Sequence, residues 1–380
     1  MSPHLKSLHL LRRLQQSSLL AAFSLVAAPL FAQHEINDEA ERGPVNISIN
    51  ENAFGYSQMS QMAIMQKLQG ANRYPREEAM ALQQALAARE GLPANHIIQT
   101  DGSGPVLLMT AMAYAEPGKN VVSSTPGYTQ LTDSFVQQGG EFKSVPLNSK
   151  LEVDLKAIKA AMDENTAIVY ICNPNNPTGT VPNPIELSQF ILSAPKDVLI
   201  FIDEAYLELA PGGLEKHSMA KLVKQRENLI VSRTFSKAWG LAGLRIGYGI
   251  AQPQVLEKLE PYHMQYPSIL SAVAAVAAIE DQDHFAYNVE QYHKVRDEFK
   301  AKLDAWGLKY AEPNGSFIFV HTGVPIEELQ ADMAAEQVLI GRPFPPLMDW
   351  ARISIGSEEE MAVFYEVFEK VMKQKGKIST

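Results

Sequence analysis

The chain has 380 residues, a formal net charge of −10, and 46% apolar against 20% charged residues. This size suits two lobes around a sizeable core, and the composition is typical of a soluble globular protein. The acidic balance, without a basic patch, argues against nucleic acid as the main partner. The single cysteine, Cys172, excludes an intrachain disulfide and a cysteine-rich zinc site, and no metal is expected.

Residues 1–32 have the pattern of a secretory signal peptide. A basic start that ends in Arg12 and Arg13 is followed by the apolar run 17–31, and Ala32 is the small residue at the predicted cleavage site. The run is short for a membrane span, although an uncleaved N-terminal anchor is the alternative. The arginine pair leaves the twin-arginine route open beside the general secretory route. We expect an exported, periplasmic protein without stable membrane insertion after cleavage.

The segment 33–70 is predicted to form a polar arm and a first helix. Helical periodicity covers residues 57–69, and a second amphipathic helix over 77–90 ends at Gly91. The methionines of the first helix are expected to fill gaps in the core, because their flexible side chains adapt to irregular space.

From residue 97 onward, short apolar strands alternate with helices, which predicts a mostly parallel sheet with helices on both faces. The predicted strands cover residues 97–100, 121–124, 167–171, 198–202 and 229–232. We expect a large domain over 71–262 and a smaller α+β domain over 263–380, which ends in a helix over 358–373.

Polar residues follow the first two of these strands. Gly102, Ser103 and Gly104 lie between a strand and an apolar helix, where backbone N–H groups and the helix dipole favour an anion. A tight connection without a ligand is the alternative. Tyr128 follows the next strand, and it could stack on a flat ring or simply pack at a turn.

Two further strands end in residues that favour a ligand site. Asn176 begins the segment Asn-Pro-Thr-Gly after the third strand, at the edge where open α/β sheets bind their ligands. Asp203 comes directly after an apolar strand and is followed by Tyr206. A carboxylate in that position is either buried and paired or functional.

The last predicted strand leads to Lys237, which lies between hydroxyl residues in a glycine-rich, apolar stretch. A lysine with a lowered pKa becomes a nucleophile, and it forms a Schiff base with a carbonyl. Thr234, Ser236 and Arg245 together could hold a dianionic phosphate beside it. A reactive lysine next to a phosphate site indicates pyridoxal 5′-phosphate.

These motifs, in this order, resemble the pyridoxal-phosphate aminotransferases of class I/II with fold type I, and within them the histidinol-phosphate aminotransferase branch. The resemblance covers essentially everything after residue 32. It implies an α/β fold in which a mostly parallel seven-stranded sheet lies between helices, with a smaller α+β C-terminal domain. It also implies a homodimer whose two active sites are shared between the subunits.

The resemblance implies a role for each motif residue. Lys237 would hold the cofactor as a Schiff base and move the proton, and Asp203 would pair with the pyridine nitrogen. Asn176 and Tyr206 would donate hydrogen bonds to the phenolic oxygen, and Tyr128 would stack on the ring. The phosphate would be bound by Gly102, Ser103, Gly104, Thr234, Ser236, Arg245 and, from the partner subunit, Tyr74.

The substrate residues depart from that branch. Arg352 matches the arginine that binds the substrate carboxylate. Phe54, however, stands where the branch tends to have a tyrosine that contacts the substrate phosphate. Gly104 and Pro105 replace the branch's usual acidic residue. Arg342 is a candidate for a second substrate anion, with an ordinary surface arginine as the alternative.

We therefore expect an aminotransferase that moves an amino group from an amino acid or related amine to a 2-oxo acid. An exported enzyme suits histidine biosynthesis poorly, so histidinol-phosphate aminotransferase proper is an alternative. A decarboxylase or lyase on the same fold is another alternative. A non-catalytic binding protein would not need this set of site residues. A dinucleotide-dependent oxidoreductase would need a Gly-x-Gly-x-x-Gly turn, which the chain lacks.

Overall fold

The computed structural model describes residues 43–263 and 266–379. Pro44–Thr380 forms one compact unit, so the expected domain boundaries at residues 70 and 262 stay predictions. The expected signal peptide over 1–32 lies outside the described residues. Of the helices in the described part of the chain, none has both the length and the apolarity needed to cross a bilayer.

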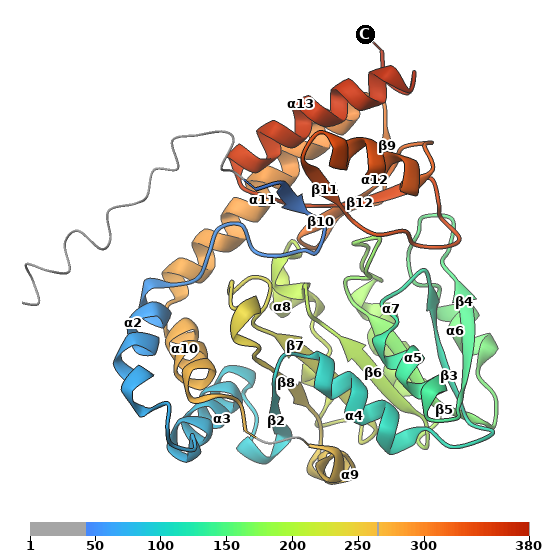
Figure 1. Ribbon diagram of the computed structural model, residues 1–380. Helices are drawn as coiled ribbons and strands as arrows, with labels where there is room; N and C mark the ends of the chain where they lie inside the picture. The colour runs from blue at the N-terminus through green and yellow to red at the C-terminus, as the bar shows by residue number, and fades with distance from the viewer. Residues whose placement is uncertain (1–42, 264–265, 380) are drawn as a thin grey trace, which may run out of the picture. The chain divides into compact units, whose positions relative to one another are not determined.

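A seven-stranded sheet forms the centre of the fold (Figure 1). Only β8 runs antiparallel to its two neighbours, and the other pairs are parallel, which confirms the predicted mostly parallel sheet. In spatial order the strands are β2 (Ile97–Thr100), β8 (Gly247–Ile250), β7 (Leu229–Thr234), β6 (Leu199–Asp203), β5 (Thr166–Cys172), β3 (Asn120–Thr125) and β4 (Glu141–Pro146).

Alternating side chains along the strands build a core on each face of this sheet. On β5, Ile168 and Tyr170 belong to one apolar cluster, and Val169 and Ile171 belong to the other. The first face is covered by α4 (Gly104–Tyr114), α5 (Gln130–Gln137) and α9 (Pro253–Leu259). The opposite face is covered by α3 (Arg76–Glu90), α6 (Leu155–Ala161) and α7 (Pro184–Ser193), and the short helix α8 (Gly213–His217) follows β6.

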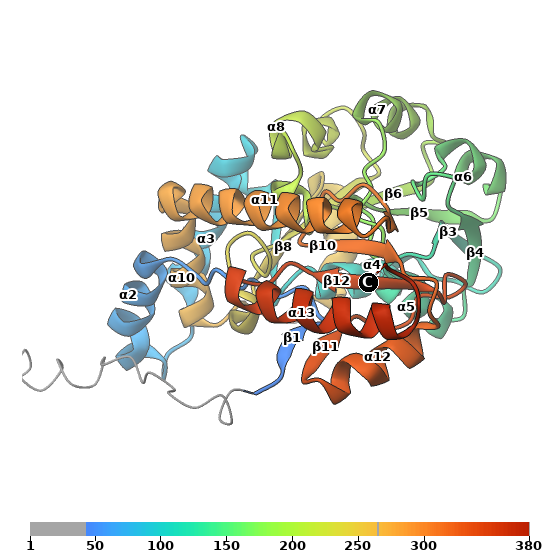
Figure 2. The same cartoon turned by 90° about the horizontal axis from the view of Figure 1, so that it is seen from above.

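The C-terminal part of the chain builds a three-stranded sheet of order β12-β10-β9. Figure 2 shows the long helices α11 (Gln282–Ala305) and α13 (Glu358–Gln374) running along this sheet. Phe299 of α11 and Phe364 of α13 pack edge to face, with 5.3 Å between their ring centroids. The elements are α10 (Ile269–Glu280), α11 (Gln282–Ala305), β9 (Lys309–Tyr310), β10 (Phe317–His321), α12 (Ile326–Ala335), β12 (Trp350–Ser354) and α13 (Glu358–Gln374).

The segment after the expected N-terminal arm reaches this C-terminal part. The strand β1 (Val45–Ile47) pairs in parallel with β11 (Val338–Ile340). The partners Val45 and Val338 are 293 positions apart in the sequence. Because β1 has only three residues, its sequence shows no periodicity from which the strand could be predicted. The pairing matters because it leads the chain from β1 directly into the functional site.

The helix α2 (Gln58–Lys67) forms where predicted, but the interpretation of its methionines is wrong. Met62 and Met65 are 54% and 57% exposed, and the only buried residue of the helix is Ser60. Ser60 donates a hydrogen bond to Ala274 O, so the small side chains of α2 and α10 allow the two helices to pack closely. The methionines of α2 therefore face outward, whereas Ile64 is half-buried and packs against the core.

Candidate active site

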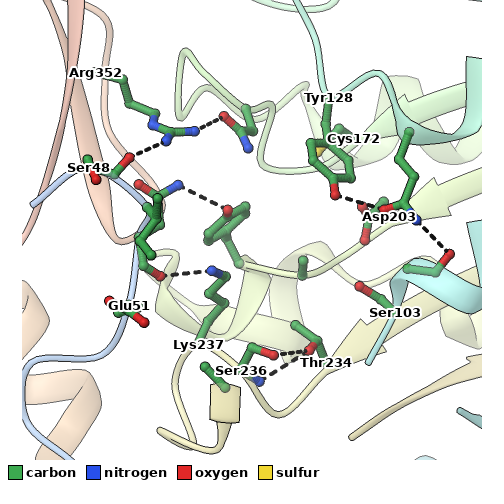
Figure 3. Close-up of a pocket in the computed structure, with 18 of the residues that line it drawn as sticks. Ser48, Glu51, Ser103, Tyr128, Cys172, Asp203, Thr234, Ser236, Lys237 and Arg352 are labelled. Carbon is green, nitrogen blue, oxygen red and sulfur yellow. Dashed lines mark hydrogen bonds between the residues drawn. The ribbon is translucent and has the colours of Figure 1, made fainter. Parts of the chain in front are cut away.

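A cavity of about 730 Å³ opens where β5, β6 and β7 end, at Cys172, Asp203 and Thr234. This is the edge at which parallel α/β sheets bind ligands. The structure brings most of the predicted site residues together around it (Figure 3). Those that line the cavity are Ser103, Gly104, Tyr128, Asn176, Asp203, Tyr206, Thr234, Ser236, Lys237, Arg245, Arg342 and Arg352.

Lys237 follows the end of β7 and points into the cavity (Figure 3). Its Nζ donates a hydrogen bond to Asn50 O at 2.8 Å and lies 5.3 Å from the centre of the Tyr206 ring. Burial, together with the positive charges of Arg352 and Arg245, lowers the pKa of Lys237 to about 8. Near neutral pH a usable fraction of this amine is therefore uncharged and nucleophilic.

Asp203 is 2% exposed and is the last residue of β6. Its Oδ1 accepts a hydrogen bond from Ser232 Oγ at 2.9 Å, and its Oδ2 lies 3.5 Å from the hydroxyl of Tyr170. Burial raises the pKa of Asp203 to about 6. A carboxylate held at this depth is suited to a cationic partner, such as a protonated ring nitrogen.

Arg352 on β12 contacts Asn176, which follows β5 of the large sheet, and both line the cavity. Arg352 donates from Nη1 to Asn176 Oδ1 at 2.8 Å and from Nη2 to Ser48 O at 2.6 Å. The side-chain oxygen of Asn176 thus accepts from Arg352, and its other end, the NH₂ group with two donors, is left for a ligand. Arg352 is 7% exposed, and among the described residues it forms no ion pair with a carboxylate.

Two hydroxyls and a helix N-terminus line the end of the cavity nearest β7. Thr234 Oγ1 donates to Ser236 Oγ at 2.9 Å and accepts from the backbone N–H of Ser236 at 3.1 Å. Ser103 is the N-cap of α4, whose free N–H groups and dipole favour an anion. Within the described part of the chain, Arg245 bonds only backbone carbonyls, at 2.9 Å and 3.4 Å, and no carboxylate there neutralises its charge, which suits an anion.

Three predicted residues lie outside the lining of this cavity. Gly102 has a positive φ of 89° and lies under Arg245, since a Cβ there would meet Nη2 at 2.5 Å. Phe54 packs edge-on against Tyr292 at 4.9 Å. Tyr74 is 88% exposed on the segment between α2 and α3. The roles assigned to these three stay predictions.

Sequence reasoning missed several residues that shape the site. Asn50 lines the cavity and contacts both Lys237 and Tyr206. Its tolerance of a left-handed backbone, within a turn-rich segment, is the signal that could have found it. Ser232 lies inside β7 and gave no signal, because its bond to Asp203 appears only when the strands pair.

A family model for "Aminotransferase class I and II" matches residues 42–368. The chain belongs to this aminotransferase family. The predictions of the fold, of the enzyme class and of pyridoxal phosphate as the cofactor are thereby confirmed. Among the described residues, no group of three or more histidine, cysteine or acidic side chains is placed to hold a metal ion.

Relatives and solved structures agree with the family. The aminotransferase is 32% identical over 336 residues to histidinol-phosphate aminotransferase from Anoxybacillus flavithermus, covering 87% of this chain and 89% of that one. A putative histidinol-phosphate aminotransferase from Erwinia carotovora atroseptica is 31% identical, with TM-score 0.84 over 88% and 97% of the two chains. The Sinorhizobium meliloti enzyme, solved in complex with pyridoxal 5′-phosphate, is 28% identical, with TM-score 0.81 over 88% and 92%.

The residues present fit pyridoxal phosphate. Close backbone contact is needed at Gly247, because a Cβ there would lie 2.5 Å from Gly102 C and 2.6 Å from Ser103 N. This contact fixes the Gly102–Ser103 turn beside Arg245, where the phosphate would be bound. The carboxylate of Asp203 and the free amide of Asn176 suit the ring nitrogen and the phenolic oxygen.

The pKa of Lys237 predicts how the apoprotein captures its cofactor. Covalent capture needs the uncharged amine, so its rate should rise about tenfold per pH unit below pH 8 and level off above it. Stopped-flow measurement of the visible absorbance of apoprotein mixed with pyridoxal phosphate checks this. A midpoint near 10, the range of an ordinary lysine, would contradict the burial argument.

The substitution Gly247→Ala is expected to weaken the phosphate site. The new methyl group meets only backbone atoms, so the Gly102–Ser103 turn must move, at a cost of about 1–3 kcal/mol in stability and in cofactor binding together. Thermal unfolding and equilibrium titration with pyridoxal phosphate measure both. Gly70→Ala is the matched control, since its Cβ would meet only Ile269 at 3.7 Å.

Proposed function

We propose that this aminotransferase takes its amino group from an α-amino acid and passes it to a 2-oxo acid, with Arg352 binding the substrate carboxylate. The observation that carries this is the buried guanidinium of Arg352, which lines the same cavity as Lys237 and has no carboxylate partner in 43–263 or 266–379. A buried cation without a carboxylate partner is costly, and an anionic substrate would remove that cost.

The contacts of Arg352 suit a carboxylate in particular. Two of its nitrogens bond neutral acceptors, and its buried Nε has no hydrogen-bond partner among the described residues. A planar carboxylate can accept two parallel bonds from a guanidinium, which orients the substrate as well as holding it.

Each polar residue then has a task during amino transfer. When bound, pyridoxal phosphate supplies a ring that accepts electrons from the substrate's α-carbon. Asp203 keeps a proton on the ring nitrogen, and Asn176 and Tyr206 donate to the phenolic oxygen. The Nζ of Lys237 moves a proton between the α-carbon of the substrate and the cofactor. Its lowered pKa suits that exchange near neutral pH.

Arg342 gives the outer end of the cavity a second positive charge. Its guanidinium lies 4.3 Å from the centre of the Phe344 ring, and that of Arg352 lies 5.0 Å from the same centre. The two cations therefore flank one aromatic ring. We propose that a substrate with a second anionic group, such as a dicarboxylic 2-oxo acid, binds Arg342 as well.

Histidinol phosphate is the second candidate donor. The relatives named for it support this reading, and a phosphate monoester could also bind Arg352. Comparing kcat/KM for histidinol phosphate and for a panel of amino acids, with several 2-oxo acids as acceptors, decides between the two. The proposal expects an amino acid to be preferred, and a preference for histidinol phosphate would replace it.

The substitution Arg352→Leu should lower kcat/KM for amino-acid donors by about 30-fold to 5,000-fold, the equivalent of 2–5 kcal/mol of lost charge-paired binding. A simple amine without a carboxylate should lose far less, because it never formed that contact. Steady-state kinetics with both donors form the test. Equal losses for the two donors would show that Arg352 supports the fold rather than the substrate.

We propose that the enzyme is a homodimer with shared sites. Support comes from apolar side chains on α2 and α3 that face outward, including Met62, Met65 and Met80 at 54–60% exposure, with Tyr74 between the helices. Exposed apolar surface of this kind marks a contact region. Sedimentation of the purified protein should give twice the monomer mass, and Met62→Glu with Met65→Glu should give the monomer.

We also propose that residues 1–32 direct export. The support is the sequence pattern itself: a basic start, a short apolar run and a small residue at Ala32. Cell fractionation with N-terminal sequencing should recover a periplasmic chain that begins at Gln33. An intact N-terminus in the cytoplasmic fraction would refute export.

A further inference from the structure

Asn50 has an unusual backbone for a residue so deeply buried. Its φ is 59°, in the left-handed region that non-glycine residues seldom adopt, and its side chain is 1% exposed. Backbone strain of this kind is kept where the surrounding contacts require it, often at functional sites. The residue lies on the segment between β1 and α2 and lines the cavity beside Lys237.

Four hydrogen bonds use the polar groups of Asn50. Its backbone oxygen accepts from Lys237 Nζ at 2.8 Å, and its amide Nδ2 donates to the Tyr206 hydroxyl at 3.0 Å. Ser354 closes a ring with it, since the backbone N–H of Asn50 donates to Ser354 Oγ at 2.9 Å and that hydroxyl donates to Oδ1 at 2.8 Å.

The direction of the bond to Tyr206 has a chemical consequence. A phenol that accepts a hydrogen bond keeps its own proton free to donate elsewhere. Tyr206 is 7% exposed and lines the cavity, and burial raises the pKa of its hydroxyl, so it stays protonated. The amide of Asn50 therefore leaves the Tyr206 proton for an acceptor within the cavity.

The bond to Lys237 has a different role. An ammonium group that donates to the Asn50 carbonyl is stabilised in its charged form, against the burial that lowers its pKa. With its left-handed backbone, Asn50 presents its carbonyl to Lys237, and Ser354 on β12 accepts a hydrogen bond from the backbone N–H of the same residue. Ser354 lies two residues beyond Arg352 on the same strand.

We propose that Asn50 is a positioning residue for the transamination machinery, in which its carbonyl holds the free amine of Lys237 and its amide directs the proton of Tyr206 into the cavity. The anchor at Ser354 ties both contacts to the strand that carries Arg352. The inference rests on the proposed roles of Lys237 and Tyr206, and it adds a residue that the motif comparison does not contain.

Two substitutions separate the two contacts. Asn50→Gly keeps the left-handed backbone and the carbonyl but removes the amide, whereas Asn50→Ala also strains the backbone and displaces the carbonyl. Asn46→Gly is the control four residues earlier, on β1, because Asn46 is exposed and lies outside the main cavity. Ser354→Ala loosens the anchor without changing Asn50, and thermal unfolding first establishes that each variant is folded.

The first measurement uses the apoprotein, so it does not depend on the cofactor. The pH dependence of the acetylation rate of Lys237, read by mass spectrometry, gives the apparent pKa of its amine. Asn50→Gly and Asn46→Gly should leave that pKa near 8, and Asn50→Ala should lower it by about one unit because the charged form loses an acceptor. An unchanged pKa in Asn50→Ala would overturn the role of the carbonyl.

The second measurement titrates the visible absorbance of the reconstituted protein. Without the Asn50 amide, the Tyr206 proton is no longer directed towards the phenolic oxygen of the cofactor, and the anionic form of that oxygen loses stabilisation. Both Asn50 variants should therefore raise, by about one unit, the apparent pKa at which the visible absorption band titrates. Ser354→Ala should shift it in the same direction. An unchanged titration in Asn50→Gly would overturn the role of the amide. Failure of the unaltered chain to bind pyridoxal phosphate would instead refute the proposed function, while the apoprotein experiment still tests the carbonyl.

Discussion

Replacing Lys237 with alanine is expected to abolish covalent attachment of pyridoxal phosphate and to lower kcat by at least about a thousandfold. The substitution removes the nucleophilic amine and also the group that moves the proton, and general acid–base catalysis alone contributes about 10²–10⁴-fold. Borohydride reduction followed by mass spectrometry of the intact chain measures attachment, and steady-state assays measure the rate.

Lys221→Ala is the control for Lys237→Ala, because Lys221 is exposed and lies outside the cavity. It should retain both attachment and rate. The Lys237→Ala variant should still bind the cofactor without a covalent bond, through Asp203, Asn176 and the phosphate site. If borohydride still fixes the cofactor to the chain at another lysine with activity intact, the assignment of Lys237 is wrong.

Replacing Arg233 with methionine is expected to destabilise the fold by about 3–5 kcal/mol, because it leaves buried carboxylates without their partner. Arg233 is 4% exposed and lies on β7 beside Thr234, facing away from the cavity. It contacts Glu90 at 2.7 Å and Glu204 at 3.1 Å. Burial raises the pKa of Glu204, and Arg233 opposes that shift.

This ion cluster supports the active site from the opposite side of the sheet. Glu204 follows Asp203, and a neighbouring carboxylate, Glu208, accepts from Trp239 Nε1 at 2.9 Å, two residues beyond Lys237. Urea unfolding of the apoprotein measures the effect of Arg233→Met. Arg76→Met is the exposed control, and adding Glu204→Gln should recover part of the loss by removing one uncompensated charge. A change below about 1 kcal/mol would contradict the cluster's role.

The parts of the fold that the sequence predicts are those with strong local patterns. The strand that ends at Asp203 is a continuous apolar run up to that residue, and the strand that ends at Thr234 begins with the apolar run 229–231, as buried parallel strands do. The edge strand β4 was not predicted, because only one of its six residues is buried and polar residues interrupt its apolar ones. The antiparallel strand β8 begins with Gly247 and has two glycines among its four residues, so it lacks the usual strand composition.

The outward-facing stripe of α2 shows a different limit. Periodicity places Met62 and Met65 on one helix face, but it does not say whether that face meets the core of the same chain. Here α2 contacts the core through Ser60, against α10, and through the half-buried Ile64. Sequence periodicity alone therefore gave the helix correctly and its environment wrongly.

The site was predicted where chemistry and chain position coincide. Lys237 and Asn176 each follow a strand and Asp203 ends one, so their convergence follows from the parallel sheet. Asn50 and Ser354 are polar residues 304 positions apart, and only the folded chain brings them together. Contacts of this kind have no local pattern and need the structure.

A single-turnover experiment tests the central claim most directly. The holoenzyme is mixed with one amino-acid donor and no acceptor, and the released 2-oxo acid, carbon dioxide and ammonia are measured together with the state of the cofactor. Transamination predicts one 2-oxo acid per active site, with the cofactor recovered in its amine form. Release of carbon dioxide or ammonia over many turnovers, with the cofactor still an aldehyde, would show that the enzyme is a decarboxylase or lyase on the same fold.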